Sequence, residues 1–271
     1  MPKTFHFISG LPRSGSTLLS ALLIQNPDVH AAMASPLGPL YGVVSSHLSA
    51  KNEVYSHISD VSRERILRGL FDNYYSYTDK KIIFDSGRYW TSKMSMIAKL
   101  FPSAKVICCI RPVEEIVSSF EKLLDSNPLE STAMFGFSSD GNLHSRAEYL
   151  RSPKGMIGAA LNNLKQAYYG PFSQRLLLVP YDRLVTEPIE VLRHIYDFTG
   201  LDPFMHNLQN VEYSADEVDR RLGAKGLHTV RGPVSARESE PRLPPELIRS
   251  CRVSNFWANP LELGASQARV L

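Results

Sequence analysis

The sequence predicts an α/β domain with a central parallel sheet flanked by helices on both faces. Four short runs of β type are nearly all apolar, as expected for parallel strands that are covered on both sides. Segments with helical spacing lie between these runs, and regular alternation of strand and helix favours a parallel sheet. The first run is followed by a glycine-containing turn that leads directly into a helical segment.

The expected strands are Thr4–Ser9, Lys81–Asp85, Lys105–Ile110 and Arg175–Pro180. Ligands in open parallel sheets bind beyond the carboxyl ends of the strands. We therefore expect functional residues directly after each of these four runs.

The expected helices follow from apolar residues that recur at helical spacing. Their ranges are Thr17–Ile24, Ser62–Tyr75, Thr91–Leu100, Val113–Leu124, Gly155–Tyr168 and Pro188–Phe198. The second carries Ile66, Leu67 and Phe71 on one face, and the last opens on a proline, which suits a first helical turn.

Length and composition indicate one globular domain over residues 1–271, with 43% apolar and 21% charged residues. Two segments, 126–154 and 212–245, lack apolar periodicity; we interpret them as lid-like loops or as disordered surface excursions. The net charge of +3 predicts no nucleic-acid partner. No apolar run reaches the ~20 residues that span a bilayer, and three cysteines cannot form a disulfide framework. We expect a cytoplasmic protein without a membrane partner, monomeric or homodimeric.

The strongest signal is the turn after the first strand, Gly10-Leu-Pro-Arg-Ser-Gly-Ser-Thr17. Its glycines are spaced as in a P-loop, so the expected fold is of the P-loop type. Backbone N–H groups in such a turn converge on an anion. The P-loop lysine is replaced by Ser16, and Arg13 is the cation within the loop, which suits a doubly anionic group better than a metal-bound triphosphate. The candidate ligands are Leu11, Pro12, Arg13, Ser14, Gly15, Ser16 and Thr17, and we expect no metal.

A second constellation follows the third strand. Arg111 stands where the strand ends, and Pro112 opens a helix on which Ser119 lies about two turns later. An arginine and a hydroxyl in this arrangement can clamp one phosphate. An ordinary arginine at a strand end is the other interpretation.

At this point the chain resembles the sulfotransferases that use 3′-phosphoadenosine 5′-phosphosulfate (PAPS) and release 3′,5′-adenosine bisphosphate (PAP). Gly10–Leu18 is similar to their 5′-phosphosulfate loop, and Arg111 with Ser119 is similar to their 3′-phosphate pair. Tyr181 lies in a stretch that looks like their tyrosine-containing strand end near the cofactor. The order and spacing of the motifs resemble those of the family from residue 4 to about residue 250. It implies PAPS as the cofactor and a sulfotransferase activity.

Within the family, the sequence looks closer to the tyrosylprotein and bacterial type than to cytosolic phenol or steroid enzymes. It lacks the catalytic glutamate that the tyrosylprotein branch carries shortly after Pro-Asp-Val, since the stretch here reads His30-Ala-Ala-Met-Ala-Ser35. Neither the base nor a tyrosine substrate carries over. Near the C-terminus, Lys225, Gly226 and Arg231 are similar in character to the segment that closes over the 3′-phosphate in cytosolic members.

Candidate catalytic residues follow from the in-line displacement at sulfur that the resemblance implies. Arg13 is expected to stabilise negative charge on the leaving phosphate. A hydroxyl acceptor needs a base, for which Glu53 is the first candidate and His57, four residues on, the second. Asp85 and Arg88 follow the second strand; Arg88 is a candidate to steady the sulfuryl group or an acidic acceptor, and Asp85 to orient a partner or act as base. The alternative for Glu53 and His57 is a pair of solvated side chains.

The acceptor is expected to be a small molecule, such as a natural-product metabolite, modified at a hydroxyl or at an amine or carbamoyl nitrogen. Sulfation of a peptide tyrosine is the alternative acceptor reaction. Two further hypotheses about the function stay open. The first is a P-loop kinase or NTPase with a degenerate loop, and the second is a non-catalytic nucleotide-binding module that has lost its base.

Overall fold

The computed structural model describes residues 3–49, 53, 57–126, 141–221, 227–235, 243–259 and 266–271. Within them the chain forms a six-stranded sheet with the order β2-β3-β1-β4-β5-β6, and every neighbouring pair is parallel. The strands are β1 (Thr4–Gly10), β2 (Val29–Ala31), β3 (Ile82–Ser86), β4 (Val106–Ile110), β5 (Leu176–Pro180) and β6 (Arg269–Val270). The parallel α/β fold expected from the sequence is confirmed.

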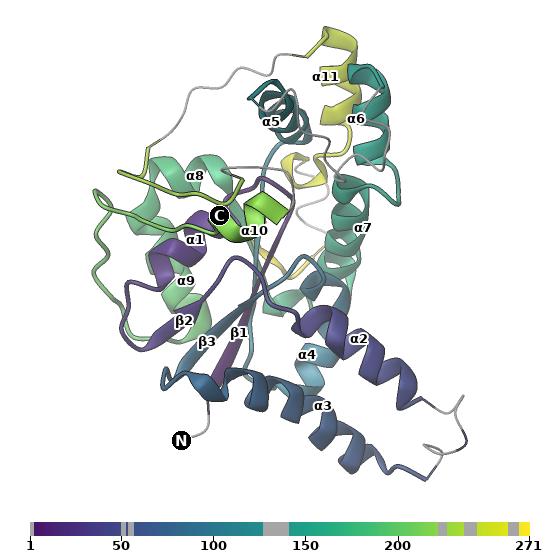
Figure 1. The fold of residues 1–271 in the computed structure, drawn as a ribbon, viewed down its shortest axis with the longest axis vertical. Coiled ribbons are helices and arrows are strands. Elements are labelled where there is room, and N and C mark those ends of the chain that lie inside the picture. Colours follow the sequence, from purple (N-terminus) through teal and green to yellow (C-terminus); the bar gives the residue numbers. More distant parts are fainter. Residues whose placement is uncertain are drawn as a thin grey trace.

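Helices connect the strands and cover both faces of the sheet (Figure 1). They are α1 (Ser16–Leu23), α2 (Leu37–His47), α3 (Asp60–Tyr74), α4 (Met94–Leu100), α5 (Val113–Ser126), α6 (Leu143–Arg151), α7 (Met156–Tyr169), α8 (Tyr181–Thr186), α9 (Pro188–Thr199), α10 (Asp216–Arg221) and α11 (Pro245–Arg252). All six helices expected from apolar spacing are present. The one expected over Thr91–Leu100 divides into a 3₁₀ turn at Trp90–Lys93 and α4.

Side chains of the central strands alternate between two apolar clusters, one on each face of the sheet. On β4, Val106, Cys108 and Ile110 belong to the first cluster, which α3, α4 and α7 cover, whereas Ile107 and Cys109 belong to the second, which α1, α8 and α9 cover. Figure 1 shows α1, α8 and α9 to the left of the sheet and α4 and α7 to its right. Both faces are therefore buried, which explains the nearly continuous apolar runs in the sequence.

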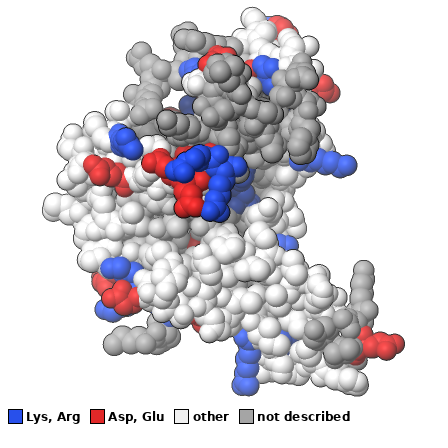
Figure 2. Space-filling view, viewed as in Figure 1, with Lys and Arg blue, Asp and Glu red and all other residues white. Residues whose placement is uncertain are grey.

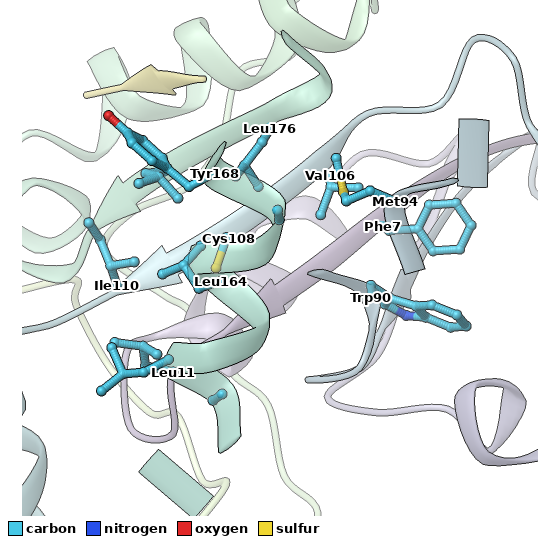
Figure 3. Packing of buried hydrophobic residues seen from close by; sticks show 14 of the residues in the cluster. Phe7, Leu11, Trp90, Met94, Val106, Cys108, Ile110, Leu164, Tyr168 and Leu176 are labelled. Carbon is cyan, nitrogen blue, oxygen red and sulfur yellow. The ribbon is translucent and has the colours of Figure 1, made fainter. Parts of the chain in front are cut away.

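The first cluster is packed around aromatic residues. Phe7 lies 4.9 Å from Trp90 between ring centroids, and both are fully buried. Figure 3 shows Leu164 and Tyr168 of α7 lying over the strand residues Cys108 and Leu176. Each fully buried side chain of this size stabilises the fold by ~1.5–3 kcal/mol, so this packing fixes α7 and the turn at Trp90 beneath the carboxyl ends of the strands.

Several short elements were not expected from the sequence. β2 and β6 have three and two residues, too few to show a periodic signal. The segment 126–154 contains α6, whose N-cap residue Asn142 accepts a hydrogen bond from the Ser145 amide, so the irregularity expected there does not extend to residues 143–151. The segment 212–245 contains α10 and an antiparallel bridge between Tyr213 and Val230. Residues 127–140, 222–226 and 236–242 of these two segments lie outside the described part.

Among the described residues, no helix is both long enough and apolar enough to cross a membrane. The three cysteines are free thiols, and all are buried. Cys108 and Cys109 are both in β4 and contribute to opposite faces of the core.

Candidate active site

The loop between β1 and α1 contains two residues in the left-handed backbone region. Arg13 has φ of 60° and Gly15 has φ of 92°. A non-glycine residue in this conformation carries local strain of about 1–3 kcal/mol, and such strain is concentrated at functional sites. Left-handed turns of this kind orient successive N–H groups to one side, so the loop has the backbone of an anion site.

Ser14 secures this loop to the sheet. Its hydroxyl donates to the carbonyl oxygens of Leu11 (2.5 Å) and Cys109 (2.8 Å), and the side chain is buried. The hydroxyl is thus engaged by the scaffold, and it is the backbone of Ser14 that remains to face an anion. This role of the hydroxyl was not foreseen from the sequence.

Gly15 is required by its surroundings as well as by its backbone angle. A Cβ atom there would lie 2.8 Å from Tyr181 Cδ2 and 3.2 Å from Leu184 Cδ2. Tyr181 is the first residue of α8, directly after β5. The tyrosine ring therefore packs against the loop between β1 and α1 at Gly15, which has no side chain.

Arg111, directly after β4, is held by three contacts. Its Nε donates to Glu115 Oε2 (2.9 Å), its Nη1 donates to the carbonyl oxygen of Arg13 (3.3 Å), and its guanidinium lies 4.4 Å from the centre of the Tyr181 ring. A planar cation stacked on an aromatic ring and paired with a carboxylate keeps one orientation. These contacts join the ends of β4 and β5 to the loop after β1.

Arg13 connects the phosphate loop with two distant segments. Its Nε donates to the Ser119 hydroxyl (3.1 Å), and its Nη1 donates to the carbonyl oxygen of Leu227 (2.5 Å). Ser119 is on α5, two turns from its start, as its spacing from Arg111 predicts. The two constellations found in the sequence are thus parts of one site.

A cavity of about 450 Å³ lies at the carboxyl ends of β1, β3, β4 and β5. This is the expected position for a ligand site in an open parallel sheet, and its size is that of a small-molecule pocket. The predicted site residues that line it are Leu11, Pro12, Arg13, Ser14, Gly15, Ser16, Thr17, Arg88, Arg111, Tyr181 and Arg231. Ser119 is not part of the wall but contacts Arg13, which is. Lys225 and Gly226 lie outside the described residues.

The structure does not bring the predicted bases to this cavity. Glu53 and His57 are exposed, lie between α2 and α3, and are not among the lining residues. In Figure 1 the end of α2 and the start of α3 project away from the sheet. The spacing of four residues indicates a shared helical face, but it carries no information about where that face points.

Asp85 is not among the lining residues either, although Ser86 and Gly87 directly after it are. It is fully buried, and its carboxylate accepts hydrogen bonds from Tyr75 Oη (2.6 Å), Trp90 Nε1 (2.8 Å) and Ser35 Oγ (2.9 Å). Burial raises the pKa of Asp85 to about 6, and the three donors act in the opposite direction. Asp85 thus links β3 to the segments that carry Ser35, Tyr75 and Trp90. Arg88, three residues after Asp85, lines the cavity and donates to Met156 Sδ (3.0 Å).

The stretch 227–231, in which Arg231 is a site residue expected from the sequence, forms part of the cavity wall over its whole length. Within it, His228 lies against the fully buried Asp219 of α10. Figure 2 shows basic and acidic side chains side by side over α10 rather than a purely basic patch. Arg221 there donates to Glu217 at 2.5 Å, both highly exposed. The charge-dense run therefore combines a solvated outer face with a cavity wall.

Comparison with known proteins identifies the family. A family model described as "Sulfotransferase family" matches residues 6–205. A Caenorhabditis briggsae protein called "Putative protein-tyrosine sulfotransferase" is 22% identical over 243 residues, which cover 82% of this chain and 78% of that protein.

Two solved structures share the fold. The sulfotransferase domain of the Synechococcus PCC 7002 olefin synthase superposes with a TM-score of 0.55 at 19% identity, covering 95% of each chain. The mouse sulfotransferase SULT7A1, complexed with PAP, superposes with a TM-score of 0.50 at 11% identity, covering 98% of this chain and 89% of the mouse protein.

Proposed function

The chain belongs to the sulfotransferase family, and on that premise we propose that it transfers the sulfuryl group of PAPS to a hydroxyl of a small-molecule acceptor. The observation that carries this proposal is the single cavity in which the phosphate loop and Arg111 meet. A nucleotide with phosphate groups at both its 5′ and its 3′ position needs two anion sites that share one pocket, and this pocket offers them.

The residues present fit such a nucleotide. The loop from Gly10 to Thr17 suits the 5′-phosphosulfate, because its left-handed backbone turns N–H groups to one side and the close contact at Gly15 leaves room for no side chain. Arg111, fixed by Glu115 and Tyr181, suits the 3′-phosphate, together with Ser119. When bound, PAPS supplies a sulfuryl group on a phosphate leaving group.

Catalysis in this pocket rests on positioning and charge, as in phosphoryl transfer. Arg13 stabilises the negative charge that develops next to the loop, and Arg88, after β3, lines the same cavity and is available to a second anionic group. The Arg13 guanidinium is positioned before the reaction, since it contacts Ser119 and Leu227. Prior fixation reduces the reorganisation needed in the transition state.

A small molecule is our first candidate for the acceptor, because the cavity of about 450 Å³ has to hold the nucleotide as well and leaves room beside it for a compact acceptor group. Sulfation of a peptide tyrosine remains the second candidate. What favours it is the 22% identity to the Caenorhabditis briggsae relative, which covers most of both chains.

Isothermal titration calorimetry with PAP, against ATP with Mg²⁺, tests the cofactor. We expect PAP to bind and Arg13→Ala and Arg111→Ala each to weaken binding about 10- to 100-fold, the usual effect of losing a hydrogen bond to a charged group. Arg111→Lys keeps the charge but loses the planar stacking on Tyr181, so we expect an intermediate affinity.

Arg193→Ala is the matched control, because Arg193 is an exposed cation on α9 that pairs with Glu190. It should bind PAP like the wild type. A preference for Mg-ATP, or PAP binding that is indifferent to Arg111, would refute the proposal and favour a P-loop kinase or NTPase.

A further inference from the structure

Asp219 and His228 form a carboxylate–imidazole pair in the wall of the cavity. Asp219 Oδ2 accepts from the backbone amide of His228 (2.9 Å), and Asp219 Oδ1 lies 2.6 Å from His228 Nδ1. The Asp219 side chain is 1% exposed and the His228 side chain 23%. Both oxygens of a buried carboxylate are thus used to hold one histidine.

This pairing determines the tautomer of a neutral His228 ring. Nδ1 carries the proton and donates it to Asp219, which leaves the lone pair on Nε2. Because the Nδ1 side of the ring lies against Asp219, Nε2 is on the edge of the ring that faces away from this carboxylate. Among the described residues, Nε2 has no hydrogen-bond partner. The ring therefore presents an unoccupied proton acceptor.

The position of His228 is fixed from both sides. The preceding residue, Leu227, accepts a hydrogen bond from Arg13 in the phosphate loop (2.5 Å). Two residues later, Val230 pairs with Tyr213, whose hydroxyl accepts from the Met33 amide (2.9 Å). The stretch 227–230 thus runs along the cavity between the loop after β1 and the segment after β2.

His228 is also distinguished by what else lines the cavity. Among the described lining residues it is the one imidazole, and none of them is a carboxylate or a lysine. The remaining titratable groups are arginines, which stay protonated, and Tyr181, whose ring lies under the Arg111 guanidinium. Glu53, His57 and Asp85 do not reach this wall, as described above.

We propose that His228 is the general base of the reaction and that Asp219 is its positioning residue. This inference rests on the proposed sulfotransferase function. The acceptor oxygen forms a bond to sulfur while the bond between sulfur and the 5′-phosphate oxygen breaks. The electron pair of the broken bond stays on the phosphate oxygen and leaves with PAP. The acceptor's hydroxyl proton passes to His228 Nε2. A base at this position indicates a hydroxyl acceptor.

His228→Asn tests the role of the base. The side-chain amide of asparagine stands near the position of Nδ1 and can still donate to Asp219, but nothing replaces Nε2. We expect PAP affinity, measured by calorimetry, to change less than twofold. Release of PAP from PAPS, measured with phenol as acceptor and with water alone, should fall 10²- to 10⁴-fold, the usual contribution of a general base. His47→Asn, an exposed histidine on α2, should behave as wild type.

A second measurement does not depend on turnover. Nitrogen-15 NMR of the histidine side chains at pH 8.5, with the His228 signals assigned by their absence in His228→Asn, should show a ring protonated at Nδ1 and unprotonated at Nε2. The opposite tautomer would overturn the proposal, because it leaves no lone pair in the cavity.

The outcomes separate this inference from the function on which it rests. If His228→Asn releases PAP at the wild-type rate, His228 is not the base, and the sulfotransferase proposal stands. If the wild-type protein binds no PAP, or binds PAP without releasing it from PAPS in either assay, the proposed function fails, and the role of His228 fails with it. Loss of release with retained PAP binding and the Nδ1–H tautomer supports both.

Discussion

Arg13 Nε donates to the Ser119 hydroxyl at 3.1 Å, although the two residues are 106 positions apart in the chain. One belongs to the loop after β1 and the other to α5, which follows β4. Because β1 and β4 are neighbours in the sheet, their carboxyl ends meet, and the two motifs become one surface. A bound anion at either motif is within reach of side chains that the other motif orients.

Ser119→Ala should weaken PAP binding about 10- to 100-fold while leaving the fold intact. The hydroxyl is an acceptor for Arg13 in the structure and the expected partner of the 3′-phosphate, and one hydrogen bond to a charged group contributes about 1.5–3 kcal/mol. Calorimetry with PAP measures the change. Ser126→Ala, at the end of the same helix, removes a hydroxyl whose one hydrogen bond within the described residues goes to the Lys122 carbonyl, and it should have no effect. Equal affinities for both variants would show that Ser119 has no part in the site.

Gly15→Ala should abolish PAP binding and lower the free energy of unfolding by about 1–3 kcal/mol. The new Cβ would meet the Tyr181 ring at 2.8 Å, and a φ of 92° is strained for any L side chain. Urea denaturation and calorimetry measure the two effects. Gly42→Ala in α2 is the control, since its Cβ would meet nothing within 4 Å and alanine is the better helix former. A Gly15→Ala protein with wild-type stability would contradict the close approach of Tyr181.

The strands and the two anion motifs were predictable because their signals are local. Apolar runs identify buried strands, and the spacing from Arg111 to Ser119 places the arginine just before a helix and the serine about two turns into it. His228 carried no such signal, because its partner Asp219 lies on the far side of residues 222–226, in a run of charges that resembles a solvated surface. The sequence did not reveal the surroundings of Asp85 for a related reason. This residue follows a buried strand, as a catalytic residue does, but its three donors come from separate elements that only the fold brings together.

Tyr75→Phe should make the stability of the protein more sensitive to rising pH. Asp85 has a pKa of about 6 in the fold, above its ordinary value of 3.8, so the folded state retains a proton that the unfolded state releases between these values. Stability from this group is therefore complete below pH 3.8 and is lost as pH rises through 6, by roughly 3 kcal/mol in all. Removing the Tyr75 donor raises the pKa of Asp85 further and enlarges the loss.

Urea denaturation at pH 4.5 and pH 7.5 measures this difference. Tyr75→Phe should lose more stability between the two pH values than the wild type does, and Asp85→Asn should lose less. Tyr77→Phe, in the same 3₁₀ turn, is the control because its hydroxyl contacts His30 and not Asp85. Identical pH dependence in Tyr75→Phe and Tyr77→Phe would show that the carboxylate does not depend on this donor.

His6 should have the opposite effect on pH dependence, in an overlapping range. Burial, assisted by the nearby Lys105, lowers the pKa of this β1 side chain from 6.5 to about 4. The unfolded state therefore binds a proton that the fold excludes, so stability from His6 is complete above pH 6.5 and is lost, by roughly 3 kcal/mol, as pH falls toward 4. As pH falls from 6 to 4.5, the stability lost at His6 and the stability gained at Asp85 offset one another.

His6→Asn should expose the contribution of Asp85. Asparagine Oδ1 can take the place of His6 Nδ1 as acceptor for the Lys105 amide, and it does not titrate. The variant should become less stable as pH rises from 4.5 to 6, whereas the wild type and the exposed control His144→Asn should change little. Urea titrations at pH intervals of half a unit measure the slope. A His6→Asn protein whose stability rises over that range would show that Asp85 is not the group that opposes His6.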